Sequence, residues 1–175
     1  MIGRDILRRQ LELVRFEKAI DYVTSASGLR KHLNSQELAS INGIMTNNSL
    51  ISPWRQEPAV IQLPSGRQET FAIHRNPIFQ CRDLLADLSQ KAREGDVEGA
   101  AASCYSQLMR CHFFKDANRR TAVAAAYWLL LENGIRIAPL GLLEMGVGDL
   151  ADPDQALALE SLVRTAVKIS RDRKK

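Results

Sequence analysis

The sequence predicts a mainly α-helical bundle that carries one β-hairpin. Apolar residues recur at helical spacing over most of the chain, and only one pair of short runs has the texture of strands. Gly, Asn and Asp-Pro signals separate these segments. The length of 175 residues fits one domain, so we expect residues 1–175 to form a single unit. A hydrophobic fraction of 45% is sufficient for a core without metal or disulfide support.

The first part of the chain predicts two helices. Residues 4–24 place apolar side chains at helical spacing, and residues 25–28, Ser-Ala-Ser-Gly, are expected to end that helix. Residues 34–46 predict the second helix, with Asn34 as its N-cap and Glu37 as the capping-box partner three residues later.

A single β-hairpin is expected in the middle of the sequence. Its two β-leaning runs, residues 58–63 and 69–73, flank a turn signal at residues 64–67. A two-stranded hairpin is marginally stable alone, so it should lie against the helices or serve as a binding element. For Trp54 and Arg55, which precede it, packing in the core and contact with a target protein both stay open.

The remainder of the sequence predicts four more helices. They are expected at residues 77–94, 97–111, 118–133 and 153–170. Asn76 and Asp96 supply N-cap signals, an Asp-Pro pair precedes the last helix, and Gly134 supplies a C-terminal stop. Residues 135–150 are rich in Gly and Leu and predict no regular element.

The charge of the chain narrows the classes of function. The net charge of +4 and the isoelectric point near 9.1 favour acidic ligands such as nucleotides. Much of the excess lies at the two ends of the chain, where solvated helix ends explain it, so nucleic-acid binding is not expected. A basic helical nucleic-acid binder is kept as a separate alternative, which strongly salt-dependent affinity would reveal.

The sequence also predicts a cytoplasmic protein without membrane contact. No run approaches the roughly 20 apolar residues of a membrane span, and the N-terminus lacks the apolar region of a secretory signal. Export into another cell stays open. The three cysteines, Cys81, Cys104 and Cys111, match no zinc spacing and are expected to be reduced, structural thiols.

The residues that carry chemistry lie between His112 and Thr121, which read His-Phe-Phe-Lys-Asp-Ala-Asn-Arg-Arg-Thr. His112 could accept a proton from an attacking hydroxyl, and Asp116 could hold a Mg²⁺ ion that bridges phosphates. Taken alone, each has another explanation, because a histidine at a helix C-terminus interacts with the dipole and a loop aspartate caps a helix or faces water. Phe113 and Phe114 are expected to pack in the core.

A helix begins directly after this loop, and a helix N-terminus binds anions through its backbone N–H groups. Ala117 is small enough for a ligand to approach the backbone, and Asn118 can cap the helix or donate to an anion. Arg119 and Arg120 carry forked cations suited to phosphate oxygens, although an arginine pair can equally lie on a solvated helix face. The combination predicts a phosphate site with an adjacent base.

This segment resembles the signature of the Fic family, His-Pro-Phe-x-(Asp/Glu)-Gly-Asn-Gly-Arg-x-x-Arg. It is still more similar to the death-on-curing (Doc) variant, His-x-Phe-x-Asp-Ala-Asn-Lys-Arg-Thr. The positions shared with the Doc form are His112, Phe114, Asp116, Ala117, Asn118, Arg120 and Thr121. Arg119 departs from both, since Fic has Gly and Doc has Lys there, and Val123 stands where Fic has its second Arg.

The resemblance implies a Fic-type helical bundle. Its core extends from about residue 34 to residue 137, with the helices 4–24 and 153–170 added at the ends. The hairpin takes the place of the family's flap, which aligns a target segment by β-strand addition. The implied activity is an ATP- and Mg²⁺-dependent modification of a Ser, Thr or Tyr hydroxyl of a target protein. A protein with this activity could be a toxin that disables a housekeeping protein.

The same resemblance implies a role for each motif residue. His112 would be the general base, Asp116 would bind Mg²⁺, the Ala117–Arg119 backbone with Asn118 would form an anion hole, Arg120 would clamp phosphate, and Phe114 would anchor the loop.

The departures bear on which group is transferred. Gly at the position of Arg119 accompanies AMP transfer in the Fic form, whereas Lys there accompanies a reversed nucleotide and phosphoryl transfer in the Doc form. Because Arg119 is a cation and Val123 removes the second Arg, we place phosphoryl transfer ahead of AMP transfer. The same departures motivate an alternative, a non-catalytic Fic-fold module that binds a nucleotide or a protein.

Regulation leaves a weaker trace in the sequence. Fic proteins are often inhibited by a helix with the pattern (Ser/Thr)-x-x-x-Glu-(Gly/Asn), and the nearest candidates, around Glu132 and Glu160, lack the Ser or Thr. We therefore expect any restraint to come from a separate antitoxin-like protein.

Overall fold

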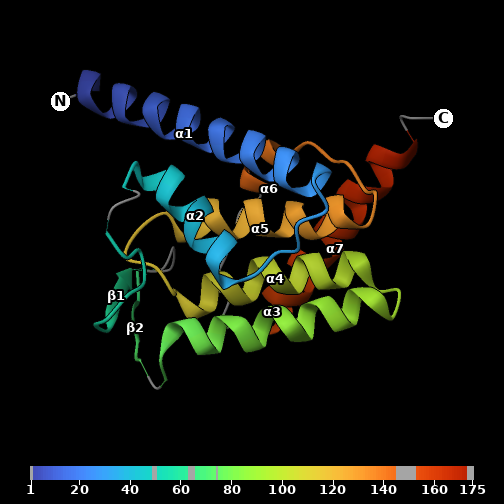
Figure 1. The fold of residues 1–175 in the computed structure, drawn as a ribbon. Helices are drawn as coiled ribbons and strands as arrows, with labels where there is room; N and C mark the ends of the chain where they lie inside the picture. The colour runs from blue at the N-terminus through green and yellow to red at the C-terminus, as the bar shows by residue number, and fades with distance from the viewer. Residues whose placement is uncertain (1, 49–50, 63–65, 74, 145–152, 173–175) are drawn as a thin grey trace.

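The computed structural model describes residues 2–48, 51–62, 66–73, 75–144 and 153–172. Within these ranges the chain forms seven helices and one two-stranded antiparallel sheet, which confirms the mainly α class with a single hairpin (Figure 1). The elements are α1 (Ile2–Gly28), α2 (Ser35–Thr46), β1 (Ala59–Gln62), β2 (Gln68–Phe71), α3 (Pro77–Arg93), α4 (Val97–Cys111), α5 (Asn118–Glu132), α6 (Pro139–Glu144) and α7 (Pro153–Asp172).

Helix α5 forms the centre of the bundle, and every residue from Thr121 to Leu130 is buried. It packs against α1, α2, α4 and α6, and Figure 1 shows α1 on one side of it and α3 and α4 on the other. Three consecutive alanines, 124–126, are completely buried in its middle, and their small side chains let neighbouring helices approach closely. The motif therefore leads directly into the most buried helix of the protein.

Helix α1 is longer than the sequence predicted. Residues 25–28 were expected to break it, but Ser25, Ala26 and Ser27 continue the helix to Gly28. Ala26 is only 4% exposed and belongs to the core, so tertiary packing outweighs the weak helix preference of the two serines. The N-terminal end of α1 projects beyond the rest of the bundle (Figure 1).

The predicted helix caps of α2, α3 and α4 are confirmed. The side chains of Asn34, Asn76 and Asp96 accept hydrogen bonds from backbone N–H groups in the first turns of these helices. Gly95 and Gly134, with φ of 101° and 73°, follow the ends of α3 and α5 in the left-handed conformation that glycine adopts without strain.

Glu37 does not act as the capping-box partner that the sequence predicted. Its carboxylate accepts hydrogen bonds from the hydroxyl of Tyr22 and from Lys31, the latter at 3.3 Å. The side chain therefore connects α2 to α1 and to the segment that follows α1.

The hairpin has the expected position but shorter strands. Ala59 pairs with Phe71 and Gln62 with Gln68, and residues 63–65 lie outside the described residues. Figure 1 shows the hairpin at one end of the bundle, near the start of α3. Within the segment that predicted no element, α6 buries Leu142 completely, while residues 145–152 are not described.

The described part of the chain contains no helix with the length and apolar character that a bilayer span requires. Cys81 and Cys104 are buried and Cys111 is half-buried, all as free thiols. Burial raises the pKa of each thiol, that of Cys81 to about 12. None is therefore activated as a nucleophile, in agreement with the predicted structural role.

Candidate active site

The motif loop connects the C-terminus of α4 to the N-terminus of α5. His112 follows α4 as its C-cap, and Ala117 precedes α5 as its N-cap. Both adopt the left-handed conformation, with φ of 47° and 58°. Such a conformation costs a non-glycine residue about 1 kcal/mol, so the surrounding contacts must hold the loop in this shape.

His112 is held in one tautomer by its own helix. Its Nδ1 lies 2.6 Å from the carbonyl oxygen of Met109, and because a carbonyl only accepts, Nδ1 carries the proton. The remaining nitrogen, Nε2, is therefore the basic one. Burial lowers the pKa of His112 below its ordinary value of 6.5, and the charge of Arg55 lowers it further. The imidazole ring also lies against Phe71 of β2, at 4.8 Å between centroids.

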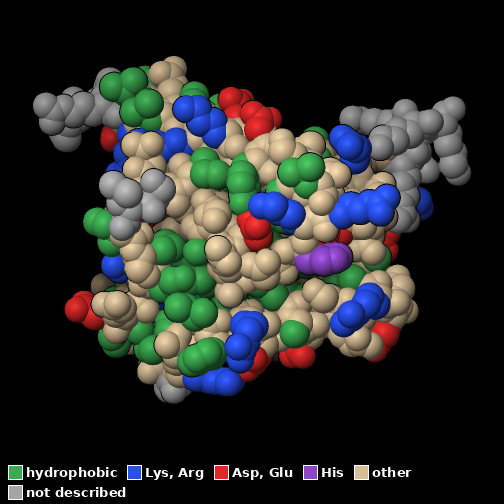
Figure 2. Space-filling view, viewed as in Figure 1, with side chains coloured by type: hydrophobic (Ala, Val, Ile, Leu, Met, Phe, Trp, Pro, Cys, Tyr) green, Lys and Arg blue, Asp and Glu red, His purple; other side chains and the backbone are tan. Residues whose placement is uncertain are grey.

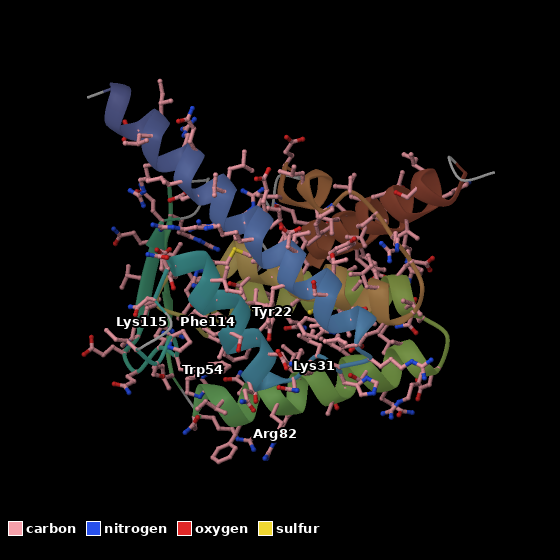
Figure 3. The ribbon with its side chains drawn as sticks, turned by 45° about the horizontal axis from the view of Figure 1, so that its top comes forward. Tyr22, Lys31, Trp54, Arg82, Phe114 and Lys115 are labelled. Atoms are coloured by element: carbon pink, nitrogen blue, oxygen red, sulfur yellow. The ribbon has the colours of Figure 1, made fainter. Side chains whose placement is uncertain are left out.

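Aromatic packing in the core anchors the loop. Phe113 and Phe114 are 2% and 3% exposed, as the sequence predicted, and both contact Trp54. Trp54 also pairs with Phe114 through a β-bridge, and Lys115 donates its N–H to the carbonyl of Pro53. Figure 3 shows Trp54, Phe114 and Lys115 together at the hairpin end of the bundle. Of the two roles considered for Trp54, the structure shows packing in the core. Its contacts hold the loop that carries the motif.

Asn118 fixes the loop through two hydrogen bonds to one residue. Its Oδ1 accepts from the N–H of Phe114 at 3.0 Å, and its Nδ2 donates to the carbonyl of Phe114 at 2.9 Å. The side chain was expected to cap the helix or contact an anion. Here it holds the loop, and Nδ2 has a second N–H besides the one that Phe114 accepts. Ala117 provides no side-chain cap for α5. The first turn of α5 therefore presents backbone donors that an anion can bind.

Asp116 is exposed at the edge of the loop. One of its carboxylate oxygens accepts from the N–H of Ala117, and its carbonyl accepts from Asn42 of α2 at 2.9 Å. The described residues contain no group of three metal-ligating side chains. Asp116 therefore fits Mg²⁺ only as one ligand among phosphate oxygens and waters, which is how this ion is commonly bound at nucleotide sites.

Arg119 is engaged by neighbouring elements. Its Nε donates to the hydroxyl of Tyr105 at 3.3 Å, and another guanidinium nitrogen donates to the carbonyl of Leu143 at the end of α6. The cation thus connects α5 to α4 and to α6. Val123, at the next turn of α5, is completely buried.

Arg120 is under-partnered. One terminal nitrogen lies 4.0 Å from a carboxylate oxygen of Glu12, and the other, Nη1, is buried without a hydrogen-bond acceptor. A buried donor without an acceptor is costly and rare in proteins. An anion in the site would give this nitrogen the acceptor that the described residues do not supply.

All six predicted site residues line one cavity of about 420 Å³. They are His112, Asp116, Ala117, Asn118, Arg119 and Arg120. The rest of its wall is formed by Ala59, Val60 and Ile61 of β1 and by Met109, Phe114 and Lys115. The cavity therefore joins a neutral histidine, an uncapped helix N-terminus, a carboxylate and two arginines next to the hairpin.

Several residues that touch this motif were not assigned to the site from the sequence. Arg55 donates to the carbonyl of His112, Asn42 donates to the carbonyl of Asp116, and Glu12 approaches Arg120. The sequence singles out Arg55 by its position before the hairpin, but no local sequence pattern marks Asn42 or Glu12 as site residues. Glu132, considered above as an inhibitory residue, instead accepts hydrogen bonds from Trp128 and the N–H of Leu33.

A model of the Fic/DOC family matches residues 32–130, which is more than half of the chain. The chain therefore belongs to the Fic/DOC family. Members of this family are typically transferases, so membership supports a Fic-type modifying enzyme in general. No curated protein sequence matches the chain.

Solved Fic-domain structures share the fold. A Fic domain-containing signalling protein from Bacteroides thetaiotaomicron aligns with a TM-score of 0.60 and 17% identity, over 92% of this chain and 72% of that one. IbpAFic2, covalently tethered to Cdc42, aligns with a TM-score of 0.65 and 15% identity, over 94% and 57%. A Fic family protein from Desulfovibrio desulfuricans G20 gives 0.58 and 16%, over 93% and 55%. At these identities the likeness shows the fold alone, and the chain spans little more than half of the last two proteins.

Proposed function

We propose that the protein is an ATP- and Mg²⁺-dependent transferase that modifies a Ser, Thr or Tyr hydroxyl of a target protein. The observation that carries the proposal is the placement of His112, the N-terminus of α5, Asp116 and Arg120 around one cavity. A base, an anion site and a carboxylate for a metal ion are the parts that transfer of a phosphate-linked group requires.

His112 has the properties of a general base. Its Nδ1 proton is engaged by Met109, so Nε2 is the nitrogen that would accept the proton of the target hydroxyl. The lowered pKa keeps the imidazole neutral at pH 7, and the base is therefore ready without prior deprotonation.

The phosphate groups of a nucleotide fit the first turn of α5 and Arg120. The helix has no side-chain cap there, and the buried Nη1 of Arg120 lacks an acceptor, so phosphate oxygens would stabilise both. ATP supplies the transferred group and leaves as ADP after phosphoryl transfer, or releases pyrophosphate after AMP transfer. Mg²⁺ held by Asp116 would neutralise phosphate charge.

The proposed substrate is a protein segment that lies along the hairpin. Ala59, Val60 and Ile61 of β1 line the cavity that contains His112, so a target backbone held there would place a side-chain hydroxyl near the base. A related fold, IbpAFic2, has been captured covalently tethered to the protein Cdc42, which supports a protein as the substrate class.

Phosphoryl transfer stays ahead of AMP transfer in this proposal. Arg119 keeps a cation at the position where the Doc form has Lys, and Val123 is apolar and completely buried, so α5 offers no second arginine at its next turn. The mass of the modified product, measured as described next, identifies the transferred group.

The deciding experiment measures intact masses of proteins in fractionated host lysates after incubation with this protein, ATP and Mg²⁺. We expect one protein to gain the mass of a phosphoryl group, or of AMP if the nucleotide binds in the other direction. His112→Ala should abolish the gain, while His32→Ala, at an exposed histidine, should not. A gain that survives His112→Ala would refute the assignment of the base.

The engaged side chain of Arg119 and the burial of Val123 favour one alternative, a non-catalytic module that binds a nucleotide or a protein. Isothermal titration with MgATP separates the two. Binding of ATP that His112→Ala leaves unchanged, without any mass gain in the lysate fractions, would favour the module.

The proposal also includes a separate antitoxin-like inhibitor, in keeping with a toxin. Expression of the chain alone should then slow the growth of a host cell, and expression of the His112→Ala variant at the same level should not. Equal growth of the two cultures would count against a toxin.

A further inference from the structure

A second cavity, of about 350 Å³, lies on the other side of the motif, against α1 and the end of α2. It shares Asp116 and Arg120 with the candidate active site and adds Arg8, Glu12 and Arg15 from α1. These three residues lie outside the range 32–130 that matches the family. The cavity therefore joins the motif to a helix that the family assignment does not cover.

The charges of this cavity, which we call the α1 cavity, are not balanced by their contacts. Arg8 bonds to Glu12 at 3.1 Å and is mostly exposed. Arg15 is half-buried and has no hydrogen-bond or ion-pair partner in the described part of the chain. Arg120 approaches Glu12 only at 4.0 Å and leaves Nη1 without an acceptor. The carboxylate of Glu12 is thus shared by Arg8 and Arg120, while Arg15 has no carboxylate partner among the described residues.

Two guanidinium groups with unused donors on one cavity are suited to an anion with several oxygens. A guanidinium forms two parallel hydrogen bonds with a phosphate, and partial burial strengthens them. Arg120 and Asp116 line both cavities, so an anion site in the α1 cavity adjoins the one at the N-terminus of α5. A chain of linked phosphates can occupy both.

We propose that the α1 cavity binds the phosphates of a nucleoside triphosphate that are linked to the phosphate at the N-terminus of α5, with Arg15 as a phosphate-binding residue beside Arg120. The choice of a nucleotide rests on the proposed function, but binding of the polyphosphate group requires no transfer. Phosphate binding would give the half-buried cation of Arg15 the anionic partner that the described residues do not supply.

The test compares three ligands by isothermal titration with the full chain: MgATP, tripolyphosphate and AMP. We expect Arg15→Ala to weaken the affinity for MgATP and for tripolyphosphate about tenfold, since it removes charged hydrogen bonds to phosphate. The affinity for AMP should not change, because its single phosphate binds at the N-terminus of α5 and has no linked phosphates that reach the α1 cavity. Arg15→Lys should lie between, because it keeps the charge and loses the fork.

Arg9→Ala is the matched control. Arg9 lies on the same helix and is exposed, and it does not line the α1 cavity, so its loss removes the same charge without removing a contact. Far-ultraviolet circular dichroism of each variant checks that α1 remains helical. Raising the salt concentration should weaken any small effect of Arg9→Ala, because exposed charges are screened.

Three results would overturn the proposal: equal losses in Arg15→Ala and Arg9→Ala, an equal loss of affinity for AMP, or no binding of tripolyphosphate by the wild type. Failure of the proposed function looks different. A protein that binds tripolyphosphate through Arg15, but modifies no target with or without His112, keeps the anion site and loses the transferase.

Discussion

Arg55 Nε donates to the carbonyl oxygen of His112 at 2.7 Å, from a side chain that is 7% exposed. Its other nitrogens donate to the carbonyls of Cys111 and Glu57, at 3.3 and 3.0 Å, and to the carbonyl of Phe71. Two of these four carbonyls belong to the end of α4 and its C-cap, and the other two flank or end the hairpin strands. One buried cation therefore holds the hairpin against the residue proposed as the base.

Replacement of Arg55 by Met should destabilise the protein by about 2–3 kcal/mol, because buried carbonyls lose charged donors. Urea denaturation measures the loss. Arg82→Met is the control, since Arg82 is exposed and stacks on Phe79, and it should cost less than about 0.5 kcal/mol. Equal costs for the two variants would show that Arg55 does not join the hairpin to the loop.

The pKa of His112 gives a prediction about pH. Burial and Arg55 lower it below 6.5, so the imidazole stays neutral as the pH falls through 6.5. In the unfolded chain the same histidine takes up its proton first. Its contribution to stability is therefore complete above pH 6.5 and is lost as the pH falls from there through the folded-state pKa.

Nuclear magnetic resonance of the imidazole checks this directly. The signal that disappears in His112→Gln should titrate with a midpoint below 6.5, and Arg55→Met should raise that midpoint because a nearby positive charge is removed. A transferase that uses His112 as its base should keep its rate down to the same midpoint. A midpoint above 6.5 in the wild type would contradict the buried, neutral base.

We expect Asn42 of α2 to contribute to the stability of the protein through its contacts with the motif loop. Its Nδ2 donates to the carbonyl of Asp116 at 2.9 Å and to Thr121 Oγ1 at 3.0 Å, and the side chain is buried. Asn42→Ala should cost about 1–3 kcal/mol, since it leaves buried acceptors unpaired. Ser40→Ala, which removes an exposed hydroxyl from the same helix, serves as the control in urea denaturation. Similar losses in both variants would contradict the link to the motif.

Glu12→Gln should strengthen the binding of tripolyphosphate. The carboxylate of Glu12 lies 4.0 Å from Arg120 and competes with an anion for the same guanidinium. Removing one partly exposed charge should raise the affinity by roughly two- to fivefold, in line with the modest energy of such pairs. Glu17→Gln, at an exposed site on α1, is the control for net charge. A decrease in affinity would show that Glu12 does not compete for Arg120.

Basic side chains are dispersed on one face of the molecule. On the face shown in Figure 2, basic side chains are interspersed with acidic and apolar ones and form no continuous patch. A measurement of salt-dependent affinity for DNA or RNA is the direct test of the expectation that nucleic acid is not a partner.

The sequence by itself determined the local features of this protein. Caps such as Asn34 and Asp96, the stop at Gly134 and the order of the helices follow from residues within one or two turns of each other, so their signals are readable along the chain. The motif is equally local, because the base, the carboxylate and the helix N-terminus fall within one loop.

Only the tertiary structure decided what surrounds that loop. Packing extended α1 through residues 25–28 and placed Glu12 and Arg15 beside Arg120, although α1 is far from the motif in sequence. It buried Arg55 among four carbonyls and directed Arg119 onto Tyr105 and Leu143. Such long-range pairings leave no periodic signal, since each depends on how whole helices stack around α5 rather than on neighbouring residues.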